Sequence, residues 1–162
     1  MKRAIIVHRW EGSPNEGWIP WLKDELEADG FKVIVPAMPN PNSPEIEAWV
    51  SHLAREVGAL DFNTFLIGHS IGCQAIMRFV ERTPQDQTAG GAVFVAPWFT
   101  LMGLDNEEDK KIAEPWLTTH IDDIAVQERL PILSCIFSDD DYCVPPENKS
   151  MFEDRLQAYS IA

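Results

Sequence analysis

The sequence predicts an α/β fold, a three-layer αβα sandwich built around a mostly parallel sheet of about five strands. Two observations predict it. Short, continuously apolar runs alternate with amphipathic segments along the whole chain, which is typical of strands that helical crossovers bury on both faces. The chain has 162 residues, of which 45% are hydrophobic and 24% charged. It shows no repeat or linker, so we expect one domain over residues 1–162.

Each element follows from its local pattern. Apolar runs predict strands at residues 4–8, 31–36, 64–68, 91–96 and 131–137. A helix is predicted after Ser43 and Pro44, which are suited to a helix start, because apolar residues then recur at helical spacing: Ile46, Trp49, Val50, Leu53 and Val57. A last helix is expected from about Pro146 to Tyr159, and parallel strands in this order favour the sheet order 2-1-3-4-5.

Charge and composition exclude several classes of function. The formal net charge is −13, which would repel nucleic acid and anionic bilayers, so we expect neither as a partner. No apolar run approaches the length of a membrane span, and the apolar run after the first three residues is too short for a signal-peptide core, so we expect a cytoplasmic protein. The three cysteines have no metal-ligand or disulfide spacing, and we expect free thiols and no metal or cofactor.

A Gly-x-Ser-x-Gly motif, Gly68–Gly72, lies between a predicted strand and a predicted helix. This context is typical of a nucleophile elbow, in which a sharp turn lifts the serine oxygen above the sheet and leaves no room for side chains at the two glycines. The predicted nucleophile is Ser70. The backbone N–H of Ile71, at the start of the helix, would then point to a developing oxyanion. The alternative is a tight strand-to-helix turn without chemistry.

A serine triad on such a fold also needs an acid after a later strand and a histidine beyond it. The run 131–137 is followed by Asp139, Asp140 and Asp141, and position alone leaves all three open. No histidine follows them. The four histidines of the chain are His8, His52, His69 and His120.

None of the four histidines has the expected triad position. His8, at the end of the first strand, could lie near Ser70 because that strand neighbours the third one, and we expect His69 to pack beneath the turn. His52 is expected in solvent, and His120 reaches the site only if the segment between the fourth and fifth strands folds over it. Without a base, serine is a poor nucleophile.

Several segments together resemble the small serine hydrolases of the retinoblastoma-binding-protein-nine/YdeN family: "HRWEGSPNEGWIPWLKDELEADGFKVIVPAMPNP", "LIGHSIGCQAIMRF", "VAPW" and "SDDDYCVPP". The resemblance implies an α/β-hydrolase fold, a Ser-Asp-His triad and a small-molecule ester or acyl substrate. It matches Ser70 to the nucleophile and Asp141, rather than Asp139 or Asp140, to the acid. It also makes Trp10 and Ile71 the backbone donors to the oxyanion, and it implies that His8 is a structural hydrogen-bonding residue of the oxyanion loop rather than the base.

The sequence departs from the family pattern at three places. The usual His-Gly-Trp is His8-Arg9-Trp10 here, and an arginine with positive φ would be strained. The family's final strand and histidine loop would lie beyond Ala162, so we expect a C-terminally truncated domain. The motif for binding the retinoblastoma protein is not met, since Phe137 stands at its last position.

These departures leave two functions open: an acyl hydrolase using Ser70 and Asp141, and a non-catalytic hydrolase-like module that binds a ligand or protein. Trp10, Trp18, Trp98 and Trp116 are candidates to line its cleft. With no sixth strand, residues 131–137 would be an apolar edge, and we expect a homodimer or aggregation through it.

Overall fold

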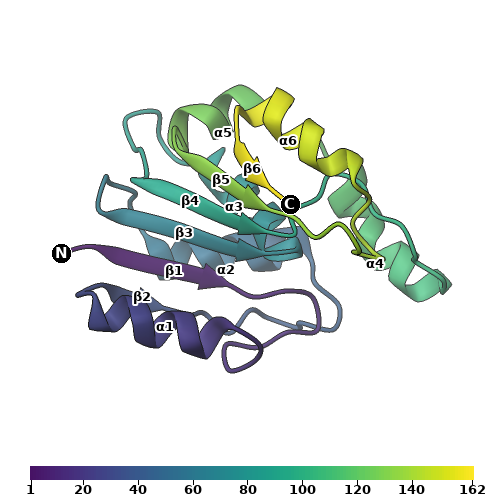
Figure 1. The fold of residues 1–162 in the computed structure, drawn as a ribbon, viewed down its shortest axis with the longest axis horizontal. Coiled ribbons are helices and arrows are strands. Elements are labelled where there is room, and N and C mark those ends of the chain that lie inside the picture. Colours follow the sequence, from purple (N-terminus) through teal and green to yellow (C-terminus); the bar gives the residue numbers. More distant parts are fainter.

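The computed structural model describes all 162 residues and contains one six-stranded parallel sheet (Figure 1). The strands lie in the order β2-β1-β3-β4-β5-β6, and every neighbouring pair is parallel. The sheet and its flanking helices confirm the predicted fold class. The strands are β1 (Arg3–Val7), β2 (Lys32–Ile34), β3 (Thr64–His69), β4 (Gly91–Val95), β5 (Leu133–Ile136) and β6 (Tyr159–Ile161).

Six helices connect the strands: α1 (Ile19–Ala28), α2 (Ile46–Val57), α3 (Ile71–Val80), α4 (Glu107–Thr118), α5 (Asp123–Arg129) and α6 (Glu147–Leu156). The face of the sheet that meets α1 holds a small apolar cluster around Ala4, Ile6 and Ile67. The opposite face holds the main core, to which α2, α3, α5 and α6 contribute. α4 lies beyond the carboxyl ends of the strands, where it borders the site described below (Figure 1).

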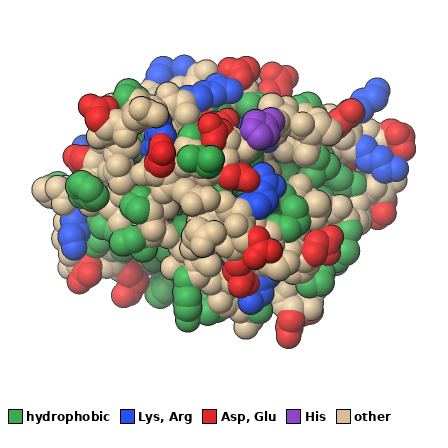
Figure 2. All heavy atoms as spheres, turned by 90° about the horizontal axis from the view of Figure 1, so that it is seen from above, with side chains coloured by type: hydrophobic (Ala, Val, Ile, Leu, Met, Phe, Trp, Pro, Cys, Tyr) green, Lys and Arg blue, Asp and Glu red, His purple; other side chains and the backbone are tan.

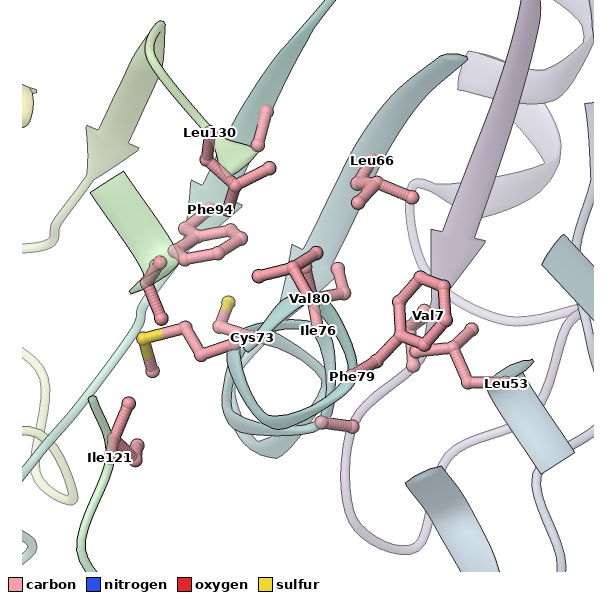
Figure 3. Packing of buried hydrophobic residues seen from close by; sticks show 14 of the residues in the cluster. Val7, Leu53, Leu66, Cys73, Ile76, Phe79, Val80, Phe94, Ile121 and Leu130 are labelled. Carbon is pink, nitrogen blue, oxygen red and sulfur yellow. The ribbon is translucent and has the colours of Figure 1, made fainter. Parts of the chain in front are cut away.

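α3 is the centre of the main core, and all ten of its residues are buried. Figure 3 shows Ile76 and Val80 directed at β3 and β4, with Phe79 lying between α3 and α2. The two polar residues of α3 are satisfied inside the protein: Arg78 Nε donates to Gln74 Oε1, and Arg78 Nη2 donates to the carbonyl oxygens of Trp116 and Thr119 at the end of α4. The helix that follows the predicted nucleophile is therefore fixed on every side.

The C-terminal residues correct the predicted topology. The last helix ends at Leu156 rather than near Tyr159, because Gln157 takes a left-handed conformation with φ 57°. The chain then turns back and forms β6, which pairs in parallel with β5 through Ser134 and Tyr159, Cys135 and Ser160, and Ile136 and Ile161. The prediction that residues 131–137 form the edge of the sheet is therefore wrong, since β6 covers them.

One face of the sheet is only partly covered, because α1 is its single helix and lies over β1 and its neighbours (Figure 1). Beyond α1, apolar side chains of β4, β5 and β6 on this face remain exposed to solvent. Ile132, just before β5, is exposed on the same face. The exposed fractions are 37% for Val93, 65% for Ile132, 39% for Ile136, 71% for Tyr159 and 49% for Ile161. Parallel sheets are usually buried on both faces, so this exposed sheet face is an unusual surface.

The rest of the surface matches the acidic composition. Seen from the top of the view in Figure 1, acidic side chains are spread over the surface between apolar and basic ones (Figure 2). None of the six helices has the length and hydropathy that crossing a bilayer would require.

Candidate active site

Ser70 occupies the corner between β3 and α3. Its backbone has φ 54° and ψ −117°, a region that non-glycine residues seldom adopt and that is stabilised here by its surroundings. The Ser70 N–H donates to the carbonyl oxygen of Val95 at 2.9 Å, and the Ser70 carbonyl accepts from Cys73 N–H at 3.0 Å. The side chain does not cap its own helix, so the hydroxyl is left free of the backbone.

The two glycines of the motif are required by space. A Cβ atom on Gly68 would lie 2.8 Å from the backbone nitrogen of Cys73, and one on Gly72 would overlap the carbonyl oxygen of Val7. Both contacts are to backbone, which cannot move aside without shifting a strand or helix. The sequence-based expectation that these positions leave no room for side chains is therefore confirmed.

The contact partner of the Ser70 hydroxyl is Trp98. Trp98 Nε1 donates to Ser70 Oγ at 3.1 Å, and the Trp98 side chain is almost completely buried. The chain reaches this position because Ala96, directly after β4, has φ 49°, which turns the backbone across the carboxyl end of β3. The sequence pattern did not indicate this contact, since a tryptophan after a strand has no defined partner.

The predicted oxyanion donors lie on both sides of the serine. Ile71 is the first residue of α3, where backbone N–H groups have no partner within the helix. The Trp10 N–H makes no hydrogen bond within the chain, and Trp10 lines the same pocket as Ser70. Arg9 does not have the positive φ that would strain an arginine. The residue of this loop with a positive φ, 61°, is Glu11.

Asp141 lies in the loop after β5 and is held by its own turn. Its Oδ1 accepts from the N–H groups of Cys143 at 2.8 Å and Val144 at 3.0 Å, and its Oδ2 takes part in no hydrogen bond within the chain. Asp140 instead accepts from the hydroxyl of Ser138, and Asp139 lies in solvent. Of the three predicted acids, Asp141 is thus the one whose carboxylate is held by backbone N–H groups.

Ser70 and Asp141 line one pocket of about 730 Å³ at the carboxyl ends of the strands. Trp10, Trp98 and Leu101 contribute apolar walls, whereas Trp18 and Trp116, the other two predicted cleft residues, lie outside its lining. Trp116 is instead buried against Trp49 in the core. A pocket of this size accommodates a small organic ligand.

A buried asparagine joins the two loops that carry Trp98 and Asp141. Asn148 Oδ1 accepts from the N–H groups of Phe99 at 2.7 Å and Thr100 at 3.1 Å. Its Nδ2 donates to the carbonyl oxygens of Thr100 at 3.1 Å and Pro145 at 2.9 Å. The side chain of Asn148 therefore fixes the loop after β4 to the loop after β5. No local sequence pattern indicates this connection.

None of the four histidines forms a hydrogen bond with Ser70 or Asp141. His8 is structural, as expected: its Nε2 accepts from Met38 N–H at 3.1 Å, and its Nδ1 lies 2.8 Å from the Arg9 carbonyl oxygen. His52 lies on α2 beside Glu56, and His120 borders a separate small cavity. His69 alone lines the Ser70 pocket, and its ring also contacts Trp18 beneath the turn.

Burial determines the protonation of the site's neighbours. Desolvation lowers the pKa of His69, with a further lowering by the positive charge of Arg9, whereas Glu16 and Asp141 act in the opposite direction. Burial also lowers the pKa of His8 and raises that of the Cys73 thiol well above its usual range. At neutral pH the two histidines are therefore uncharged and Cys73 is a thiol, not a second nucleophile.

A parallel sheet of order 2-1-3-4-5-6, with a serine at the strand-to-helix corner after its third strand, defines the class of α/β hydrolases. The structure of the YdeN gene product of Bacillus subtilis matches with a TM-score of 0.88 and 28% identity, covering 100% of this chain and 86% of that one. Est1E of Butyrivibrio proteoclasticus, solved with ferulic acid bound, shares the fold with a TM-score of 0.74 at 15% identity, over 99% of this chain and 79% of that chain.

The sequence model of the family described as "Serine hydrolase" matches residues 4–161, and the chain belongs to this family. In sequence it is similar to the hydrolase YdeN of Bacillus subtilis (strain 168), with 39% identity over 95 residues, which is 59% of this chain and half the length of YdeN. It is also similar to the serine hydrolase RBBP9 of Rattus norvegicus, with 27% identity over 160 residues, covering 96% of this chain and 81% of that protein. The family resemblance inferred from the motifs is confirmed.

Proposed function

We propose that the chain is an acyl hydrolase for small carboxyl esters, with Ser70 as the nucleophile and Asp141 as the acid that orients a general base. Ser70 Oγ attacks the ester carbonyl carbon as its proton passes to the base, and the carbonyl oxygen becomes an oxyanion held by the N–H groups of Trp10 and Ile71. The C–O bond then breaks, the alcohol leaves with the proton, and water releases the acid from the acyl-serine.

The observation that carries this proposal is the corner at Ser70. Its φ of 54° is a conformation that costs free energy, and such conformations gather at functional sites. The corner opens on a pocket that Asp141 shares, and it occurs in a chain that matches the serine hydrolase family from residue 4 to 161.

The general base is the triad member that no histidine contact supplies in this structure. None of the four histidines in the chain joins Ser70 to Asp141, so we expect turnover by this chain to be slow. Sites that lack one triad member retain roughly 10³–10⁴-fold acceleration over water, from oxyanion stabilisation and binding.

Reaction with a fluorophosphonate tests the nucleophile directly. Ser70 Oγ forms a bond to phosphorus, fluoride leaves, and the hydroxyl proton passes to solvent. We expect labelling that Ser70→Ala abolishes and that Ser138→Ala, a serine in the wall of the same pocket, leaves unchanged. Labelling that persists in Ser70→Ala, or an unlabelled native chain, would contradict the proposal.

The missing histidine contact favours a second candidate, a non-catalytic module that binds a small ligand in the same pocket. Trp10 and Trp98 would then supply apolar contact area. This candidate predicts that a short-chain alkyl amide, which resembles an ester but resists hydrolysis, raises the melting temperature of the native chain and of Ser70→Ala equally. A melting temperature unchanged by the amide in both proteins would speak against it.

Some expectations from the sequence remain predictions: a cytoplasmic location, the absence of nucleic-acid and membrane partners, and a homodimer. A dimer would have to use a surface other than the strand 131–137, whose free side is taken by β6.

A further inference from the structure

The hydroxyl of Ser70 contacts a group that can donate a hydrogen bond but cannot accept one, which is unusual for a nucleophile. The indole Nε1 of Trp98 lies 3.1 Å from Ser70 Oγ, and an indole N–H only donates. Ser70 Oγ is therefore the acceptor in this bond, and its own hydrogen points elsewhere. Trp98 cannot be the base. By occupying one side of Ser70 Oγ, it determines from which side a base can reach the hydroxyl hydrogen.

Trp98 is rigidly placed for this contact. Its carbonyl oxygen accepts from Nε2 of buried Gln74 at 3.0 Å, and Gln74 lies on α3, one turn beyond Ser70. On the other side, the N–H of the next residue, Phe99, donates to Asn148. These bonds hold the backbone at Trp98, and burial holds the side chain. The indole dipole therefore lies at Ser70 Oγ without reorganisation, which is the condition for electrostatic catalysis.

We infer that Trp98 acts directly on the nucleophile: its indole N–H stabilises the deprotonated oxygen of Ser70 and directs the hydroxyl hydrogen toward the open pocket. A hydrogen bond to a charged oxygen is roughly twice as strong as one to a neutral oxygen, so the contact favours the alkoxide over the alcohol. When Ser70 attacks, its proton goes to the base or to water in the pocket, and Trp98 keeps its own. The inference rests on the proposed role of Ser70.

The chain offers a matched control for this role. Trp116 is as deeply buried as Trp98, and its Nε1 also donates one hydrogen bond, to the Pro44 carbonyl oxygen at 3.0 Å. Its partner lies outside the Ser70 pocket. Trp98→Phe and Trp116→Phe therefore remove the same group from similar surroundings, and only the first removes it from the nucleophile.

The test is the rate of fluorophosphonate labelling of Ser70 as a function of pH. We expect Trp98→Phe to slow labelling roughly tenfold near neutral pH and to move the rise of the rate to higher pH. Trp116→Phe should keep the native pH profile, whatever it does to stability. The titratable groups of the pocket, His69 and Asp141 among them, are the same in both variants.

Three outcomes separate the possibilities. Equal pH profiles for the two variants overturn the role of Trp98 and leave Ser70 as the nucleophile. An unlabelled native chain overturns the proposed function and this inference with it. Should Trp98→Phe fail to fold, the indole N–H proton resonance of Trp98 replaces it: we expect Ser70→Ala to move this resonance upfield, and an unchanged resonance would overturn the inference.

Discussion

His8 is a buried polar residue that stabilises the fold and makes no hydrogen bond with Ser70 or Asp141. It is 1% exposed, and its Nε2 accepts a backbone N–H while its Nδ1 contacts a backbone carbonyl. Because the first contact needs an acceptor, the bound form is the neutral ring with hydrogen on Nδ1. His8 thus joins β1 to the segment around Met38 and fixes the start of the loop that carries Trp10.

This arrangement predicts how stability changes with pH. Burial lowers the folded-state pKa of His8 and of His69 from 6.5, so the unfolded chain takes up these protons first as the pH falls. Stability from the two neutral rings is complete above that value and is lost below it, down to the folded-state pKa values. Urea unfolding between about pH 5 and pH 8 should show this loss. His69→Gln should reduce it, and a native chain equally stable throughout would contradict the prediction.

Asn148 predicts a second effect at this scale. Asn148→Ala would leave the N–H groups of buried Phe99 and half-buried Thr100 without an acceptor, so we expect a loss of about 3 kcal/mol in the free energy of unfolding. Urea denaturation at neutral pH measures it, and Gln85→Ala, at an exposed position, is the control. Because Asn148 also holds the loops of the site, ligand binding should weaken as well. A loss as small as that of the control would mean that water replaces the side chain.

At the scale of the elements, the sequence predicts most accurately where a pattern is local. The helix over residues 46–57 and the strand, turn and helix around Ser70 all follow from periodicity and from two glycines. The start of α2 differs, since Glu45 and not Ser43 precedes it and no side chain caps it. β6 was missed because three residues cannot show a period, and its formation depends on the left-handed residue at 157.

That residue allows a simple test of the α6–β6 connection. Gln157 has φ 57° and ψ 34°, a conformation that glycine adopts without penalty. We expect Gln157→Gly to raise the free energy of unfolding by about 0.5–1 kcal/mol, as measured by thermal or urea denaturation. Gln157→Ala removes the same side chain but keeps the penalty, so it should not stabilise. Stabilisation by both variants would show that the side chain, not the backbone, is responsible.

At the scale of the whole molecule, the long-range contacts of the site lie beyond sequence patterns. That Ser70 and the acids after β5 share one edge could be predicted, because both follow strands and the carboxyl ends of parallel strands meet at one edge. The choice of Asp141 among the three acids came from the family resemblance. The hydrogen bond from Trp98 to Ser70 and the hydrogen bonds by which Asn148 joins two loops could not be predicted, since both depend on how these loops fold over that edge. The exposed sheet face was not foreseen either, because an apolar strand pattern does not tell whether a helix covers it.

The exposed sheet face predicts the behaviour of the molecule in solution. Replacing Ile132 and Ile161 together by threonine keeps two β-branched residues but reduces the apolar surface. We expect less self-association by light scattering at high concentration, with stability changed by no more than about 0.5 kcal/mol. Ile124→Thr, which removes a still more exposed isoleucine on α5, should not alter association. A native chain that is monomeric at high concentration would contradict the prediction.

The complete burial of α3 has a consequence for motion. A helix with ten inaccessible residues has no free side on which to fray, so its amide hydrogens should exchange with solvent only when the entire domain opens. The corner at Ser70 is therefore attached to the most slowly exchanging part of the protein, while loops form most of the walls of its pocket. A ligand would enter by movement of the walls around a fixed serine.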